Sequence, residues 1–321
     1  MAVGARIGDY EILEKIGAGG MSEAFRALAR GPGSHRRELV IKRILPHLAE
    51  DADFIKSFVN EAKILGMLNH PNVVGVYDFG MDDGRHYLAL EYLNGPSLAT
   101  LMARAREQGR RIPPGVAAYL GREIGRGLMA VHSLRGADGA SLNVIHRDVT
   151  PSNVMTTTAG AVKLLDFGIA RIGMAAKLTQ HGQIKGKAGY LAPEQITGGP
   201  IDARVDLFAL GIVLHEILRL DYLFYGEGGD VATVYRIMEV PIPSLSSFRD
   251  DLPPALDAIV MKALARDPEQ RYQAAEELTR DLDLVVAQSG LRKDDITRFV
   301  ATAEPSSSSV LSPVGPTVTR T

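Results

Sequence analysis

The sequence predicts an α+β fold in two unequal parts: a small β-rich N-terminal part with one long helix, and a larger, mostly helical part. Two observations lead to this prediction. Short apolar runs separated by turns fill residues 10–45, which is typical of strands. From Pro96 onward, apolar residues recur at three- and four-residue spacing, which is typical of helices. A short linker at residues 91–96 would join the two parts.

The elements follow from these periods in chain order. In the N-terminal part we expect strands at 10–17, 23–29 and 38–45, a helix at 53–68, and strands at 73–79 and 86–92. In the C-terminal part we expect helices at 97–107, 114–134, 202–219, 253–265 and 273–287, with loops and short strands over 135–200. Residues 133–143 contain Asp138-Gly139 and predict a surface hairpin. Ser, Thr and Pro dominate residues 302–321, which predicts a disordered tail.

Composition restricts the classes of protein that remain. The 321 residues are 45% hydrophobic and 23% charged, with a net charge of −2, so no basic field indicates nucleic acid. Cysteine is absent, which excludes disulfides and thiol chemistry. The most apolar internal stretch, Leu207 to Leu218, is interrupted by His215 and Glu216, whereas a membrane-spanning helix needs about 20 apolar residues. We therefore expect a soluble, cytoplasmic protein that binds neither nucleic acid nor membrane.

A glycine-rich turn separates the first two expected strands. It runs from Gly17 to Ser22, with glycines at 17, 19 and 20. Glycines let main-chain N–H groups approach a phosphate closely, although a tight hairpin uses glycines as well. The turn alone leaves both explanations open.

A lysine lies at the end of an apolar strand. Lys42 follows Leu39-Val40-Ile41, where an unpaired ammonium would be costly. The nearest obvious partner is Glu61 on the following helix. A solvated lysine and an ordinary surface glutamate would explain the same residues.

Three further motifs carry the chemistry. They are His146–Asn153 (HRDVTPSN), Asp166–Gly168 (DFG) and Ala192–Glu194 (APE), in this order. With these motifs the chain resembles the eukaryotic-like (Hanks-type) protein kinases, in particular their bacterial serine/threonine branch, over residues 10–287. The resemblance implies a bilobal protein-kinase-like fold, with an N-lobe at about 10–92, a hinge at about 91–96 and a C-lobe at about 97–287.

The resemblance also implies roles for single residues. Asp148 would accept the proton of the substrate hydroxyl, and Asn153 and Asp166 would hold Mg²⁺ through oxygen atoms. Lys42, positioned by Glu61, would hold the phosphates of ATP. Glu194 and Arg271 would form a buried ion pair, and Asp206 would anchor the catalytic loop. The residues expected to bind ATP are Ile16, Gly17, Gly19, Gly20, Ser22, Ala24, Val40, Lys42, Leu90, Glu91, Leu93 and Met155.

Several positions depart from the family pattern. Ser22 replaces the third glycine of the phosphate loop, and Ala24 and Val40 exchange the usual valine and alanine above the adenine. Thr150 occupies the position of a catalytic-loop lysine, while Lys187 occupies the position of a docking-loop threonine. We interpret this last pair as an exchange, in which Lys187 brings the ammonium to the γ-phosphate and Thr150 supplies the hydroxyl.

Activation is predicted to involve one threonine. Between Asp166 and Glu194 the only hydroxyl residues are Thr179 and Tyr190. A phosphate on Thr179 would bridge Arg147 and Arg171 and order the loop. Thr179 is therefore the candidate phosphosite.

The sequence thus predicts a serine/threonine protein kinase that uses ATP and Mg²⁺ and acts on protein substrates. Its alternative is a pseudokinase scaffold that binds nucleotide and partners without efficient catalysis. A small-molecule kinase of related fold and a tyrosine kinase are further alternatives, which the Ala-Pro-Glu segment and Pro151 disfavour respectively. Control by a regulatory protein partner, or by a homodimer that autophosphorylates in trans, fits the short tail.

Overall fold

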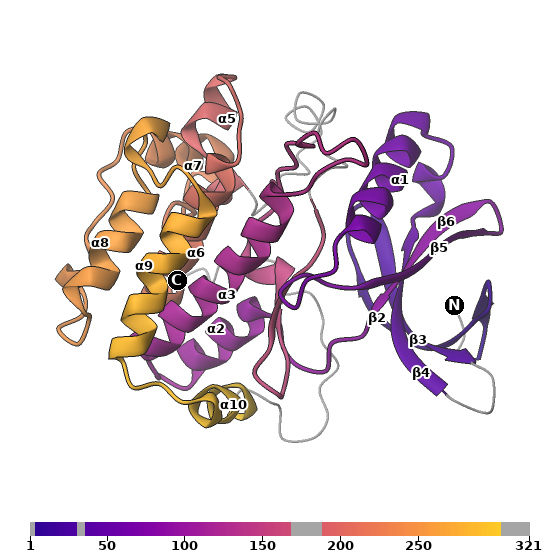
Figure 1. The fold of residues 1–321 in the computed structure, drawn as a ribbon, viewed down its shortest axis with the longest axis horizontal. Coiled ribbons are helices and arrows are strands. Elements are labelled where there is room, and N and C mark those ends of the chain that lie inside the picture. Colours follow the sequence, from indigo (N-terminus) through magenta and orange to yellow (C-terminus); the bar gives the residue numbers. More distant parts are fainter. Residues whose placement is uncertain (1–3, 31–35, 168–187, 303–321) are drawn as a thin grey trace.

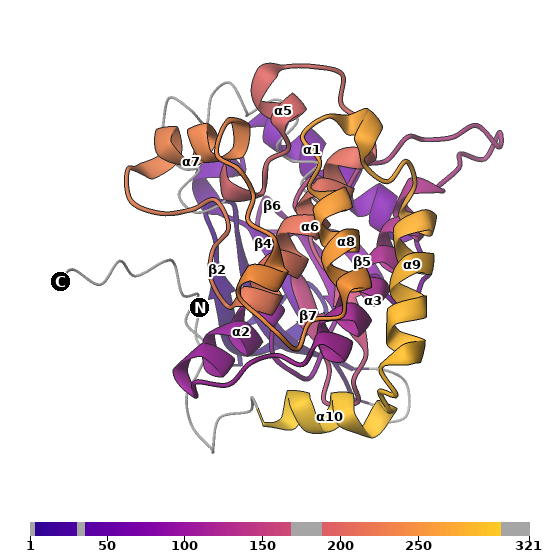
Figure 2. The ribbon, with the colours of Figure 1, turned by 90° about the vertical axis from the view of Figure 1, so that its left-hand side faces the viewer.

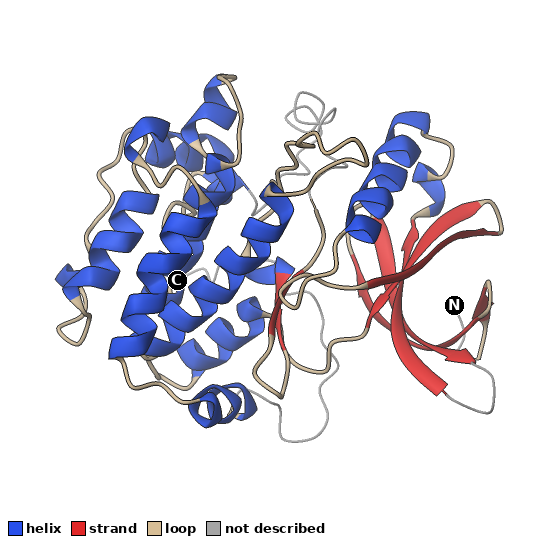
Figure 3. Ribbon diagram, in the orientation of Figure 1, coloured by secondary structure: helices blue, strands red, loops and turns tan. Residues whose placement is uncertain are grey.

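The computed structural model describes residues 4–30, 36–167 and 188–302. They form two lobes, one built mainly of strands and one mainly of helices (Figures 1 and 3). The α+β class and the division into a small β-rich part and a larger helical part, both predicted from the sequence, are confirmed. Within the described residues, no helix has both the length and the apolar character needed to cross a bilayer.

The N-lobe contains one antiparallel sheet in the order β1-β2-β3-β4-β6-β5. Its strands are β1 (Arg6–Ile7), β2 (Tyr10–Ala18), β3 (Ser22–Arg30), β4 (Arg36–Ile44), β5 (Val76–Asp82) and β6 (Arg85–Glu91). β5 begins three residues later than predicted. The reason is that Val73 and Val74 bond to the C-lobe instead, since Val74 N–H donates to the Leu164 carbonyl at 2.9 Å.

The two faces of the sheet have different partners. Alternate residues of a strand point to opposite faces. One face carries Phe25, Leu39, Ile41 and Ala89, which form a small core of their own with Ile7 and neighbouring residues. The other face carries Val40, Lys42 and Leu90 and is directed toward helix α1 (Ala52–Met67). This second face is therefore the one that can line a site between the lobes.

Helix α1 is fixed at its start and along one side. Asp51 is the N-cap and accepts a hydrogen bond from Phe54 N–H at 3.0 Å. Phe54, Phe58 and Leu65 recur at helical spacing and are buried in the core beneath the sheet. Glu61 is also buried, with 2% of its surface exposed. Because it lies between apolar positions, this carboxylate needs a partner inside the protein.

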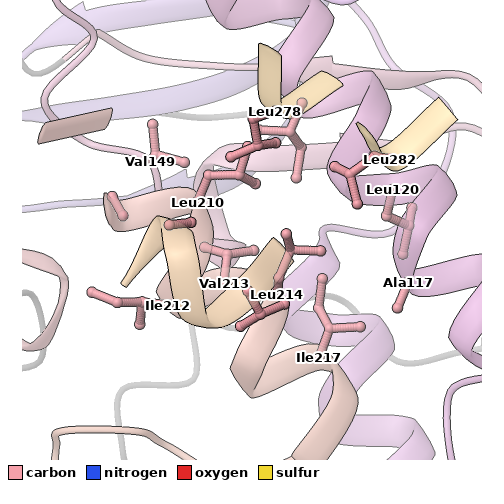
Figure 4. Packing of buried hydrophobic residues seen from close by; sticks show 14 of the residues in the cluster. Ala117, Leu120, Val149, Leu210, Ile212, Val213, Leu214, Ile217, Leu278 and Leu282 are labelled. Carbon is pink, nitrogen blue, oxygen red and sulfur yellow. The ribbon is translucent and has the colours of Figure 1, made fainter. Parts of the chain in front are cut away.

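The C-lobe contains eight of the described helices and a two-stranded sheet. They are α2 (Leu98–Glu107), α3 (Pro114–His132), β7 (Val154–Thr156), β8 (Val162–Leu164), α5 (Pro193–Thr197), α6 (Arg204–Arg219), α7 (Gly229–Met238), α8 (Pro254–Ala263), α9 (Ala275–Gln288) and α10 (Lys293–Ala301). Helix α6 lies at the centre, and its residues from Val205 to Leu218 are all buried. Figure 4 shows its apolar side chains among those of α3 and α9.

Three helices were not predicted. Helix α5 has only five residues and lies within 135–200, where loops and short strands were expected. The β-branched residues of α7 obscure its helical spacing, and α10 is short and highly charged, with only Ile296 and Val300 buried. Thr302, the first residue of the expected tail, is the C-cap of α10, and residues 303–321 lie outside the described residues. The predicted hairpin over 133–143 is confirmed, because Arg135 pairs with Ser141 and Gly139 adopts a φ of 79°.

Candidate active site

The lobes meet at the segment after β6, which is bonded to the C-lobe sheet. Thr158 N–H donates to the Asn94 carbonyl and Thr156 N–H donates to the Pro96 carbonyl, each at 3.0 Å. Gly95 has a φ of 156°, and a Cβ there would lie 2.1 Å from the Thr156 carbonyl oxygen. Only glycine fits such an approach. The linker predicted from the sequence is therefore held in register against β7.

Lys42 joins three separate parts of the chain. Its Nζ lies 3.1 Å from Glu61 Oε1 on α1 and 2.8 Å from Asp166 Oδ1, which follows β8. Burial lowers the pKa of the Lys42 ammonium, but Asp166 and Glu61 outweigh this and hold the pKa above its usual value. Lys42 therefore remains charged, and the partner expected from the sequence is present.

Asp206 holds the main chain of the catalytic loop. One oxygen accepts from His146 N–H and the other from Arg147 N–H, both at 2.8 Å. Arg147 has a φ of 64°, a conformation that residues other than glycine rarely adopt. Burial raises the pKa of the Asp206 carboxyl, but His132 and the other donors outweigh it and leave the pKa below its usual value. The predicted anchoring role of Asp206 is confirmed.

Asp148 and Asn153 face each other within this loop. Asn153 Nδ2 donates to Asp148 Oδ2 at 2.6 Å and to the Asp148 carbonyl at 2.9 Å. Asp148 is 7% exposed and Asn153 is 8% exposed. Leu165 N–H donates to the Asn153 carbonyl at 2.8 Å, directly before Asp166. The fold thus brings Asp148, Asn153 and Asp166 into one neighbourhood.

A ring contact holds the residue that follows Asp166. The rings of His146 and Phe167 lie 4.7 Å apart, and His146 Nε2 bonds to the Leu165 carbonyl at 2.8 Å. Phe167 is buried in the same cluster as Leu65 of α1. Burial lowers the pKa of the His146 imidazole, which favours its neutral form. The loop and α1 are therefore coupled through packing as well as through Lys42.

The residues expected around adenine share the Lys42 face of the sheet. Ala24 pairs with Lys42 across β3 and β4, and Val40 pairs with Leu90 across β4 and β6. Met155 lies on β7 in the opposite lobe and is half-buried. The Glu91 carboxylate bonds to Lys163 Nζ at 2.9 Å and to Gly75 N–H at 3.1 Å. The contact with adenine that the sequence predicts uses the main-chain carbonyl of Glu91, and neither of these two bonds involves that atom.

Thr150 is buried beside the catalytic loop. It is 3% exposed, and its hydroxyl has no hydrogen-bond partner among the described residues. A buried hydroxyl without a partner is unusual in proteins. Lys187, the other member of the predicted exchange, and the candidate phosphosite Thr179 both lie outside the described residues.

A second buried ion pair stabilises the C-lobe below the site. Arg271 donates to both oxygens of Glu194, at 2.6 and 2.7 Å, and stacks on Phe208 at 4.7 Å. Such a two-pronged contact fixes geometry as well as charge. The ion pair predicted from the sequence is confirmed.

Two supporting residues gave no signal in the sequence. His132, at the end of α3, bonds to Asp206 at 2.8 Å, and Lys163 on β8 bonds to Glu91. Neither residue lies in a motif, and each meets its partner only through the fold. The sequence gives one hint of such partners: a carboxylate that is expected to be buried but has no cationic residue close to it along the chain.

The chain belongs to the protein kinase domain family, whose model matches residues 10–282. Among curated proteins, it is 38% identical to the tyrosine-protein kinase MasK of Myxococcus xanthus over 281 residues. It is also 38% identical to the serine/threonine-protein kinase PknB of Mycobacterium leprae over 278 residues. These matches cover 88% and 85% of this chain but only 43% and 42% of the relatives' lengths.

Solved structures give the same result. The crystal structure of the Mycobacterium tuberculosis PknI kinase domain superposes with a TM-score of 0.68 at 25% identity. The match covers 91% of this chain and 100% of the PknI chain. The resemblance to bacterial Hanks-type kinases inferred from the motifs is confirmed.

The Asp206 anchor can be tested without any assay of activity. In Asp206→Asn, one oxygen becomes an amide NH₂, which cannot accept from a main-chain N–H. The free energy of unfolding should fall by about 2–4 kcal/mol, because buried donors lose a charged acceptor. Hydrogen exchange of the His146 and Arg147 amides should also accelerate. Asp221→Asn, at a half-exposed surface ion pair, is the matched control and should change neither quantity. Unchanged exchange at both amides would refute the anchor.

Proposed function

We propose that this chain is a serine/threonine protein kinase that transfers the γ-phosphate of Mg-ATP to hydroxyl groups of proteins. The observation that carries the proposal is that Lys42, Asp166 and the Asp148–Asn153 pair lie close together between the two lobes of a protein kinase fold. Phosphoryl transfer depends chiefly on positioning and charge neutralisation, and this neighbourhood offers both.

The glycine-rich turn supports nucleotide binding. Gly17, Gly19 and Gly20 do not have positive φ angles, and a Cβ on any of them would meet no atom closer than 3.9 Å. The hairpin itself therefore does not require glycine at these positions. Close approach of a phosphate to the main-chain N–H groups explains them better than the structural alternative.

The donor set suits magnesium. Because Asn153 Nδ2 is bonded to Asp148, its carbonyl oxygen Oδ1 is the atom left for a cation. Asp166 adds a carboxylate, and hard cations such as Mg²⁺ prefer such oxygen ligands. When bound, Mg-ATP supplies the phosphoryl group and neutralises part of its charge. Lys42 would then hold the phosphates while Glu61 keeps its ammonium in place.

Asp148 is the proposed base. Its Oδ2 accepts from Asn153, which holds the carboxylate in one orientation within the buried loop. From this position it would accept the hydrogen bond and the proton of the substrate hydroxyl. Asp206 acts as a positioning residue, because it holds the loop and not the substrate.

The choice of acceptor hydroxyl rests on the sequence. MasK is named a tyrosine kinase and PknB a serine/threonine kinase, at equal identity to this chain. Pro151, directly after Thr150, is typical of the serine/threonine branch and favours that assignment. The pseudokinase alternative draws support from Ser22 and Thr150. It is disfavoured because the residues expected to hold ATP and metal and to accept the proton are present, namely Lys42, Glu61, Asp148, Asn153 and Asp166.

Thr150 and Lys187 are proposed to share one task. The unpartnered hydroxyl of Thr150 supports the exchange inferred from the sequence, in which Lys187 delivers an ammonium to the γ-phosphate. An ammonium about 4 Å from the phosphate is worth on the order of 4 kcal/mol at an effective dielectric of 20. Solvent and Mg²⁺ would screen part of this energy.

The proposed reaction is tested with radiolabelled ATP, Mg²⁺ and a generic protein acceptor. Label should appear on phosphoserine or phosphothreonine, and Asp148→Asn should lower turnover by about 10²–10⁴, the usual worth of a positioned general base. Asp138→Asn, in the exposed hairpin, is the control and should transfer at the wild-type rate. Wild-type turnover in Asp148→Asn would show that the base is wrongly assigned, and label confined to tyrosine would overturn the serine/threonine specificity.

The Thr150–Lys187 exchange is tested by a mutant cycle. Lys187→Ala should slow transfer roughly a hundredfold, which corresponds to about 3 kcal/mol. Thr150→Lys alone should also slow it, because two ammonium groups would then crowd one phosphate. The double variant, Thr150→Lys with Lys187→Thr, should recover much of the rate. If Lys187→Ala matches the wild type, the exchange does not exist.

A further inference from the structure

The linker between the lobes is attached to the C-lobe at its far end by main-chain bonds. The carbonyls of Asn94 and Pro96 accept from N–H groups on and just after β7, and Ser97 pairs with Met155 of the same strand. β7 pairs with β8, and Figure 3 shows this small sheet between the C-lobe helices and the N-lobe sheet. Seen from the C-lobe side, β7 lies beside α2 (Figure 2). The end of the linker is therefore fixed to the sheet that carries Met155.

The start of the linker is attached to the same small sheet through a side chain. Glu91 ends β6, and its Oε2 lies 2.9 Å from Lys163 Nζ. Lys163 lies on β8, where it is paired with Met155 of β7. Residues that are paired across two antiparallel strands have their side chains on the same face. Lys163 thus reaches the linker from the position next to the residue expected beneath adenine.

Two further bonds bring the segment before β5 into this contact. Lys163 Nζ also donates to the Val73 carbonyl at 3.2 Å, and Gly75 N–H donates to Glu91 Oε2 at 3.1 Å. Glu91 N–H donates in turn to the Gly75 carbonyl at 2.8 Å. The side chains of Lys163 and Glu91 are only 14% and 27% exposed, so solvent screens their attraction less than that of a surface pair. Lys163 therefore joins β8, the segment before β5 and the linker.

The groups expected to bind adenine lie between these two attachments. They are the main-chain carbonyl of Glu91 and the N–H of Leu93, with Met155 expected below the base. Because both ends of the linker are bonded to the β7–β8 sheet, the protein sets the distance between these groups and Met155 before a nucleotide binds. Groups that are ordered in advance bind a ligand more tightly, since the cost of ordering them is not incurred on binding.

We propose that Lys163 is a positioning residue for the nucleotide base, which holds the start of the linker at a fixed distance from Met155. The inference rests on the proposed ATP-dependent function and names how this chain presents its contacts to adenine. The ammonium of Lys163 is bonded to Glu91 and Val73, whereas the phosphates would lie at Lys42. Loss of Lys163 should therefore weaken binding of the base and leave the phosphate contacts unchanged.

The test compares a ligand that has phosphates with one that has none. Dissociation constants of adenosine and of Mg-ATP are measured by calorimetry on the full chain, for the wild type and for Lys163→Met, which keeps a long apolar side chain but loses the ammonium. Both ligands should bind about tenfold more weakly to the variant, which corresponds to about 1.4 kcal/mol. The factor should be the same for both, because only the base contacts are displaced.

Two further variants give the conservative rescue and the matched control. Lys163→Arg should restore most of the affinity, because a guanidinium also donates to a carboxylate. Lys262→Met removes an ammonium that has a partner elsewhere in the C-lobe, the Tyr272 ring at 4.0 Å, and should leave both dissociation constants unchanged.

A mutant cycle tests whether Lys163 acts through Glu91. Glu91→Ala should weaken adenosine binding by about the same factor as Lys163→Met, and the double variant should bind no more weakly than either single one. Losses that add up in the double variant would show that the two residues act separately and would overturn the proposal. Glu91→Ala removes the same bond from the other side, so it also decides the outcome if Lys163→Met does not fold.

Other results would overturn the proposal as well. A purely structural lysine predicts a lower free energy of unfolding with wild-type affinity for adenosine, and that result would refute the positioning role. Weaker binding of Mg-ATP with unchanged binding of adenosine would place the effect at the phosphates and refute it too. Binding is measured without any transfer of phosphate. A chain that binds both ligands as expected but transfers no phosphate would refute the proposed kinase activity and leave the role of Lys163 intact.

Discussion

The ammonium of Lys42, held between Glu61 and Asp166, is the contact on which the geometry of the site depends. It connects the sheet, helix α1 and the segment after β8, which are otherwise joined by apolar packing. A buried carboxylate such as Glu61 is stable only with a partner, so the position of α1 follows from the position of Lys42. Lys42 Nζ also contacts Asp166 of the C-lobe. This contact fixes the distance between the two lobes at the place where the phosphates of ATP would lie.

Helix α6 has the corresponding role in the C-lobe. Since its residues from Val205 to Leu218 are all buried, the polar side chains in this stretch need partners in other segments. Asp206 accepts hydrogen bonds from the main chain of the catalytic loop, and Glu216 accepts one from the Tyr190 hydroxyl at 2.7 Å. Burial raises the pKa of the Glu216 carboxyl to about 7. The two carboxylates thus tie the catalytic loop and the segment before Glu194 to one rigid support.

The sequence predicted the features that local patterns encode. Lys42, Glu61, Asp148, Asn153 and Asp166 stand in motifs whose chemistry demands these residue types, and the fold brings them together. His132 and Lys163 could not be predicted, because each acquires its partner only when distant segments pack. The helices α5, α7 and α10 were missed for a different reason. Helix α5 is too short to show a helical period, α7 is rich in β-branched residues and α10 has few apolar ones. Lys187 and Thr179 stay predictions, since they lie outside the described residues.

The most direct test of this account separates binding from transfer at Lys42. Single-turnover phosphate transfer and Mg-ATP affinity should both be measured for the wild type and for Lys42→Met. The wild type should transfer phosphate. The variant should lose about 10³-fold or more of the transfer rate, while its affinity for Mg-ATP falls much less. The reason is that the Lys42 ammonium stabilises the charge on the phosphates more strongly in the transition state than in bound ATP. A wild-type protein that binds Mg-ATP without transfer, or a Lys42→Met variant with the wild-type rate, would contradict the account.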